Sequence, residues 1–230
     1  MYFPVKKQIP NLFTLGNLSC GVLAILSIFS DEKEMAVWLL LLAAALDFFD
    51  GFLARLLKVS GELGKQLDSL ADMVTFGIAP SFMLYALSSD IAGYARYAFI
   101  LLAIFSCYRL AKFNIDTRQS NSFIGVPTPI TGIMCISWAY VKNPARDFIF
   151  SNAVVFVIFC VLVSLLLVSS LRLPSLKLKK GPLSNYTKHL VLLGIGLVTL
   201  SFAGWLCIPV FYAAYVLSSV TNIFKRANQD

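Results

Sequence analysis

The chain has 230 residues, of which 58% are hydrophobic and only 13% are charged. Soluble domains carry about 25% charged residues, so this composition excludes an ordinary soluble globule. The net charge of +7 would suit a nucleic-acid-binding protein, but apolar runs such as 153–168 recur along the whole chain. They predict a multi-pass membrane protein that has no nucleic acid among its partners.

The apolar runs, about 15 to 23 residues long, match the length that a helix needs to cross a bilayer. They predict an all-α protein with eight transmembrane helices near residues 12–29, 35–57, 68–88, 95–112, 127–141, 148–170, 188–203 and 205–224. A polar, basic stretch after the sixth span divides the chain. We therefore expect a six-span catalytic body at 1–172, a cytoplasmic connector at 173–187 and a C-terminal two-span segment at 188–230.

The basic residues predict the orientation of these spans, because cytoplasmic loops collect Lys and Arg. With both termini in the cytoplasm, only Lys33, Arg96, Lys142 and Arg146 lie outside, and the other 15 of the 19 basic residues lie inside. The same orientation places all three tryptophans, Trp38, Trp138 and Trp205, at the outer ends of spans. We expect a protein of the cell membrane with both termini cytoplasmic.

The first span begins with polar residues at helical spacing, Asn11, Thr14 and Asn17. Residues three apart lie on one face of a helix. These side chains either line a polar cavity, where they would bind an acceptor or a lipid phosphate, or hydrogen-bond to one another.

The second and third spans carry four aspartates, although a charge in the middle of a membrane costs at least ~2.5 kcal/mol. Asp47 and Asp50 are three residues apart, and Asp68 and Asp72 are four apart, so each pair lies on one helix face. The short loop between the spans makes them antiparallel neighbours, and the four carboxylates are expected to converge. Hard oxygen ligands of this kind suit Mg²⁺ or Mn²⁺ held together with phosphates, and two divalent ions would balance the charge.

The residues that surround these aspartates form a specific pattern. From Asp47 to Asp72 the sequence reads DxxDGxxAR, eight residues, and then GxxxDxxxD. This pattern resembles the signature of the CDP-alcohol phosphotransferase family at every position. Within that family, IPNLFTLGNLSCG at 9–21, DSLADMVTFGIAPS at 68–81 and the stretch from YRLAKFNID to FIGVPTP resemble the phosphatidylserine synthase branch.

The resemblance implies a function and roles for individual residues. It implies transfer of a phosphatidyl group from CDP-diacylglycerol to L-serine among membrane lipids, at a cytoplasmic active site, by a homodimer. Asp47, Asp50, Asp68 and Asp72 would hold the metal ions, with Asp72 also the base for the acceptor hydroxyl. Four further residues of the pattern would bind CDP: Gly51, Ala54, Arg55 and Gly64.

The fourth span ends with further polar residues, Arg109 and Asn114, and Arg118 follows in the loop. They either frame an anionic acceptor or lipid phosphate, or reflect only the positive charge of a cytoplasmic loop. Gly77 and Pro80 in the third span are expected to permit a bend or close packing beyond Asp72.

Two alternative functions stay open at this point. The first is the same chemistry with another acceptor, such as glycerol 3-phosphate or an inositol phosphate, or headgroup transfer from CDP-choline or CDP-ethanolamine. The second is a divalent-cation transporter, which would also place aspartates within the membrane. For the enzyme, a single in-line displacement is the simplest mechanism because no side chain looks like an activated covalent nucleophile, and a two-step route is not excluded.

Overall fold

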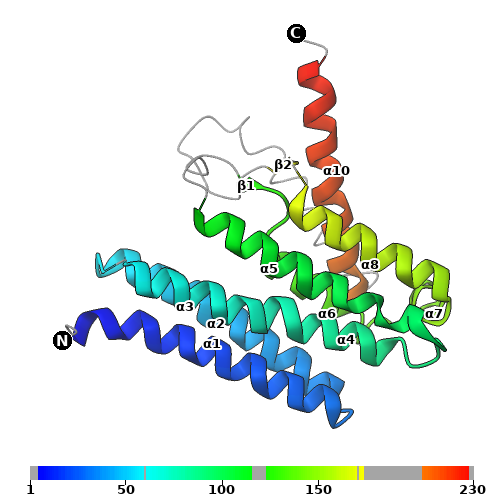
Figure 1. The fold of residues 1–230 in the computed structure, drawn as a ribbon, viewed down its shortest axis with the longest axis horizontal. Coiled ribbons are helices and arrows are strands. Elements are labelled where there is room, and N and C mark those ends of the chain that lie inside the picture. The colour runs from blue at the N-terminus through cyan, green and yellow to red at the C-terminus, as the bar shows by residue number, and fades with distance from the viewer. Residues whose placement is uncertain (1–4, 60, 116–122, 170, 174–203, 228–230) are drawn as a thin grey trace.

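The computed structural model describes residues 5–59, 61–115, 123–169, 171–173 and 204–227 (Figure 1). Its α-helices are α1 (Val5–Phe29), α2 (Lys33–Leu56), α3 (Glu62–Asp72), α4 (Ala79–Leu87), α5 (Ile100–Ile115), α6 (Thr128–Ser137), α7 (Pro144–Ser151), α8 (Ala153–Val168) and α10 (Cys207–Ala227). The only strands in these described parts, β1 (Phe123–Ile124) and β2 (Arg172–Leu173), form one short antiparallel pair. The expected helical architecture is confirmed apart from this pair.

Four helical stretches are long and apolar enough to cross a membrane: Gln8–Phe29, Lys33–Leu56, Glu62–Leu87 and Tyr94–Ile115. The last begins with the 3₁₀ turn Tyr94–Phe99 and continues into α5. These stretches agree with the first four predicted spans. The helices α7 and α8 form a fifth candidate, but they are bent by 94° relative to each other.

The helices α1 and α2 form a tight antiparallel hairpin, and α3 and α4 run alongside it (Figure 1). Small side chains allow this close approach, since Ala24, Ala36 and Ala43 are fully buried. At Gly21 of α1, an added Cβ would lie 2.5 Å from Oγ1 of Thr75. The first and third spans therefore touch where the glycine has no side chain.

The third span departs from regular α-helical geometry directly after Asp72. Residues Met73–Ile78 form a π-helical segment, and α4 continues from it. Pro80 lies in the first turn of α4 and has no N–H to donate to the preceding turn. The wider π-helical turn before it accommodates this missing hydrogen bond, and the helix continues without a break. The close packing expected beyond Asp72 is present at Gly77, where an added Cβ would lie 3.1 Å from Cβ of Ser106.

The fifth and sixth predicted spans differ from the structure. The helix α6 has only 10 residues, about 15 Å, which is too short to cross a bilayer alone. The predicted span 148–170 is interrupted because the Asn152 side chain accepts hydrogen bonds from the N–H groups of Val154 and Val155 and begins a new helix, α8.

The C-terminal helix α10 packs against α6. Its approach is fixed by Trp205, which stacks on Tyr140 with ring centroids 4.4 Å apart and meets Trp38 edge-on at 6.3 Å. The predicted span 188–203 and nearly all of the connector at 173–187 lie outside the described residues.

Candidate active site

Three carboxylates converge between α2 and α3. One oxygen atom from each of Asp47, Asp50 and Asp68 lies within 4.8 Å of the other two. Asp47 and Asp50 occupy successive turns of α2, and α3 presents Asp68 to them. The predicted convergence of these three side chains is therefore present.

Asp72 lies beside this group. Its carboxyl is within hydrogen-bonding reach of Asp47 and interacts electrostatically with Asp50 and Asp68. Only 7% of Asp72 is exposed, and Asp50 is similarly buried at 5%. The four predicted aspartates thus form one carboxylate cluster, with three in a compact group and Asp72 adjacent on the deeper side of α3.

The helix α1 supplies polar partners to the cluster. Thr14 Oγ1 donates a hydrogen bond of 2.6 Å to Oδ2 of Asp50, and Asn17 Nδ2 donates one of 3.4 Å to Oδ1 of Asp72. Both α1 side chains are buried. Of the two sequence interpretations, the structure places Thr14 and Asn17 at a shared polar site, where they contact carboxylates and not each other.

The residues present fit a divalent cation. Within the described ranges, no Lys or Arg forms an ion pair with any of the four aspartates. Closely spaced carboxylates repel one another unless a cation neutralises them, and Mg²⁺ and Mn²⁺ prefer such oxygen ligands. Asn17 Oδ1 is buried and has no hydrogen-bond partner in the part of the chain that the structure describes, whereas a buried acceptor of this kind normally has one. The cluster therefore offers a set of oxygen donors that lacks a positive charge.

The predicted CDP-binding residues lie at the same end of α2 and α3. A Cβ added at Gly51 would meet only the Arg55 guanidinium, at 3.9 Å, and one added at Gly64 would meet Oδ1 of Asn11 at 3.5 Å. Arg55 is exposed and Ala54 half-buried. The backbone at both glycines is therefore approachable, and Asn11 lies across from Gly64, beside the predicted CDP-binding residues.

The remaining predicted acceptor residues do not share one environment. Asn114 accepts a hydrogen bond from Ser69 at 3.1 Å through Oδ1, and its backbone carbonyl accepts one from Lys65 at 2.6 Å. Arg109 instead donates to the carbonyl of Gly125 at 3.4 Å. Arg118 lies outside the described residues. Asn114 thus joins α5 to α3, whereas Arg109 faces the segment that precedes α6.

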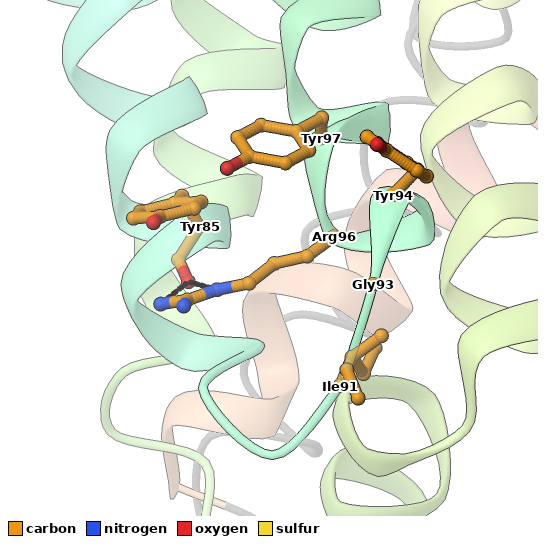
Figure 2. A pocket seen from close by; sticks show the side chains of 7 residues that line it. Tyr85, Ile91, Gly93, Tyr94, Arg96 and Tyr97 are labelled. Atoms are coloured by element: carbon orange, nitrogen blue, oxygen red, sulfur yellow. Dashed lines mark hydrogen bonds between the residues drawn. The ribbon is translucent and has the colours of Figure 1, made fainter.

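A separate hollow of about 390 Å³ lies at the opposite end of the third span (Figure 2). It is lined by Tyr85, Tyr97 and Arg96, among others, and the Arg96 guanidinium sits 3.7 Å above the Tyr85 ring. Arg96 also donates to the Tyr85 carbonyl, one of the last carbonyls of α4. Tyr85 lies 13 residues beyond Asp72, or about 20 Å along a helix, so this hollow is distinct from the carboxylate cluster.

Sequence reasoning missed two residues that support the site. Ser69 and Thr75 flank Asp72 at three-residue spacing, and Thr75 donates to the backbone carbonyl of Asn17 at 3.3 Å. Helical periodicity applied to polar residues around the aspartates would have identified both.

The helices and the buried carboxylate cluster define a multi-pass membrane protein with a polar site inside its helical bundle. Residues 7–178 match the family described as CDP-alcohol phosphatidyltransferase. The chain belongs to this family of membrane transferases. This confirms the resemblance inferred from the pattern between Asp47 and Asp72.

Individual relatives agree with this assignment. The chain is 34% identical over 189 residues to a CDP-diacylglycerol--serine O-phosphatidyltransferase of Helicobacter pylori, covering 81% of this chain and 80% of the relative. It is 37% identical over 139 residues to a protein of the same name from Bacillus subtilis, covering 60% and 78%. An archaetidylserine synthase of Methanothermobacter thermautotrophicus is 31% identical over 173 residues, covering 72% and 69%.

Proposed function

We propose that this protein transfers the phosphatidyl group of CDP-diacylglycerol to the hydroxyl of L-serine, giving phosphatidylserine and CMP. The observation that carries the proposal is the convergence of Asp47, Asp50 and Asp68 inside the family motif. The names of the relatives from Helicobacter pylori and Bacillus subtilis support serine as the acceptor.

The carboxylate cluster would hold divalent metal, Mg²⁺ or Mn²⁺, and two ions would balance its four negative charges. Asp47, Asp50, Asp68 and Asp72 are the proposed ligands, oriented by Thr14 and Asn17. When bound, such ions polarise a phosphoryl group and neutralise charge on the leaving nucleotide. The predicted CDP-binding residues Gly51, Ala54, Arg55 and Gly64 lie beside this cluster, with the Arg55 guanidinium available to the diphosphate.

In the proposed reaction the serine hydroxyl oxygen attacks the phosphorus that bears diacylglycerol. A new P–O bond forms to serine, and the P–O bond to CMP breaks as CMP takes the bonding electrons. Asp72 accepts the hydroxyl proton. One in-line displacement accounts for the products, and no activated nucleophile is assigned among the described residues.

We place the active site at the cytoplasmic face of the cell membrane. Support comes from the contact of Asp50 with Thr14, which lies in the N-terminal half of α1, and from the excess of basic residues predicted on that side. We retain the division of the chain into a catalytic body, a connector and a C-terminal segment, which rests on the polar, basic stretch after residue 172. We also propose a homodimer, which rests on the family resemblance.

The experiment that tests this proposal is an acceptor panel with purified full-length protein and CDP-diacylglycerol. L-Serine should give phosphatidylserine and stoichiometric CMP. A product formed only with glycerol 3-phosphate or an inositol phosphate would replace serine as the acceptor. Divalent-cation flux into sealed vesicles, independent of CDP-lipid and without CMP release, would favour a transporter.

A further inference from the structure

Arg109 on α5 is a buried cation that meets no counter-charge among the described residues. Only 8% of the residue is exposed, its Nη2 donates to the Gly125 carbonyl, and its Nε has no hydrogen-bond partner. In the parts of the chain that the structure describes, no carboxylate forms an ion pair with it. A buried guanidinium normally has an anionic partner, because removing the charge from water is costly.

The donors around Arg109 are suited to an anion. The Gly125 carbonyl lies three residues before Thr128, the first residue of α6, whose N-terminus has no side-chain cap. Uncapped N–H groups at a helix N-terminus attract negative charge. The hydroxyls of Thr128 and Ser106 are also buried without partners, and Ser106 lies one turn before Arg109 on the same face of α5.

We call Ser106, Arg109, Thr128, Tyr212 and Tyr215 the Arg109 cluster. Along the helix axes, this cluster lies at nearly the same level as Asp72. The register of α5 against the third span is fixed by two contacts, the hydrogen bond between Ser69 and Asn114 and the approach of Gly77 to Ser106. The spacing from Ser69 to Gly77 on the third span equals the spacing from Ser106 to Asn114 on α5, so the two antiparallel helices stay in register between these contacts. Arg109 is therefore offset from Asp72 by about two residues, or ~3 Å along the helix axis.

The helix α10 closes the Arg109 cluster. Tyr212 and Tyr215 are 6% and 2% exposed, and both phenol groups lie near the Arg109 guanidinium. The hydroxyl of Tyr212 also lies 3.3 Å from Oγ1 of Thr131, one turn into α6. The family match ends at residue 178, so these contacts come from a part of the chain beyond it.

We propose that the Arg109 cluster binds the carboxylate of the amino-acid acceptor, and that α10 takes part in the site because Tyr212 and Tyr215 position the Arg109 guanidinium. This inference rests on the proposed function, and it assigns the carboxylate of the acceptor to the Arg109 cluster. Because α5 packs against the third span, the proposal places the acceptor on a helix that neighbours Asp72. Tyr212 and Tyr215 are positioning residues, because they act through Arg109.

The test compares L-serine with serinol, which keeps the amine and a hydroxyl but has no carboxylate. Loss of a charge-assisted hydrogen bond in Arg109→Gln should raise KM for L-serine about 10- to 100-fold. KM for serinol and for CDP-diacylglycerol should change by less than about 3-fold. Arg109→Lys should recover part of the preference for serine.

Tyr212→Phe removes only a hydroxyl and should raise KM for L-serine about 3- to 10-fold with little change in kcat. The matched control is Tyr140→Phe, which removes a hydroxyl from the ring that stacks on Trp205, just before α10, and should leave both KM values unchanged. If KM for CDP-diacylglycerol rises in the Arg109 variants and KM for L-serine does not, the anion belongs to the lipid donor and the assignment is overturned.

The outcomes separate this inference from the function on which it rests. A wild-type protein that makes no phosphatidylserine contradicts the proposed function. A wild-type protein that makes it, together with an Arg109→Gln variant that still prefers serine over serinol by the wild-type ratio, contradicts only the carboxylate site.

Discussion

Thr14 of α1 donates a hydrogen bond of 2.6 Å to Oδ2 of Asp50, 36 residues further along the chain. This contact ties the first helix to the carboxylate cluster. A hydroxyl that contacts a metal-ligating carboxylate fixes which oxygen faces the ion. The first span thus contributes to the site through positioning.

Replacing Thr14 should therefore weaken metal binding. Thr14→Val keeps the shape but removes the donor, and we expect the metal concentration for half-maximal activity to rise about 10- to 100-fold. Thr14→Ser should stay near wild type. The control is Ser19→Ala, whose exposed hydroxyl donates to the Leu15 carbonyl of the same helix. An unchanged metal titration for Thr14→Val would show that the hydrogen bond has no such role.

Asp72 is proposed both as a base and as a metal ligand, and one substitution separates the two roles. If the base role dominates, Asp72→Asn should lower kcat by about 10² to 10⁴ and leave CDP-diacylglycerol affinity nearly intact. If ligation dominates, metal and nucleotide affinity should fall together, and added Mg²⁺ should partly restore turnover. Titration of both ligands distinguishes the two cases, and a near wild-type kcat would reject both roles.

Gly132 of α6 maintains the packing of that short helix on the third span. An added Cβ would lie 2.9 Å from the backbone carbonyl oxygen of Phe76, so Gly132→Ala should cost about 1 to 3 kcal/mol through overpacking. The midpoint of thermal unfolding should fall by several degrees. At Gly61 an added Cβ meets nothing within 4 Å, so Gly61→Ala should lower the midpoint much less than Gly132→Ala does. Equal midpoints for the two variants would contradict this packing.

The proposed orientation predicts a labelling pattern. In a background without the native cysteines, single cysteines at 31–34 and 142–147 should react with a membrane-impermeant reagent from outside. Cysteines at 58–65 should be protected in intact cells and become reactive after permeabilisation. The reverse pattern would place the carboxylate cluster on the outer side.

The active-site aspartates could be predicted from the sequence because their spacing is local. Asp47 and Asp50, and Asp68 and Asp72, share helix faces by periodicity alone, and a short loop brings the faces together. Charged residues are also rare within transmembrane spans because they are costly there, so their presence indicates a functional site.

The sixth predicted span shows why the rest could not be predicted in the same way. Hydropathy averages over a window, so the apolar run 153–168 concealed the break at Asn152. The cap signals were present, since Asn143 and Asn152 are both typical helix N-caps. Contacts between distant segments, such as Arg109 with Gly125 and Thr131 with Tyr212, leave no periodic signal in a single sequence.

The central claim is that the carboxylate cluster supports transfer by binding divalent metal. Its most direct test is CMP release by the purified protein with CDP-diacylglycerol and L-serine after treatment with EDTA, followed by titration with Mg²⁺ or Mn²⁺. We expect no turnover without metal, saturable recovery with it, and no recovery for a folded Asp68→Asn variant. Full activity in the metal-free buffer would contradict the account.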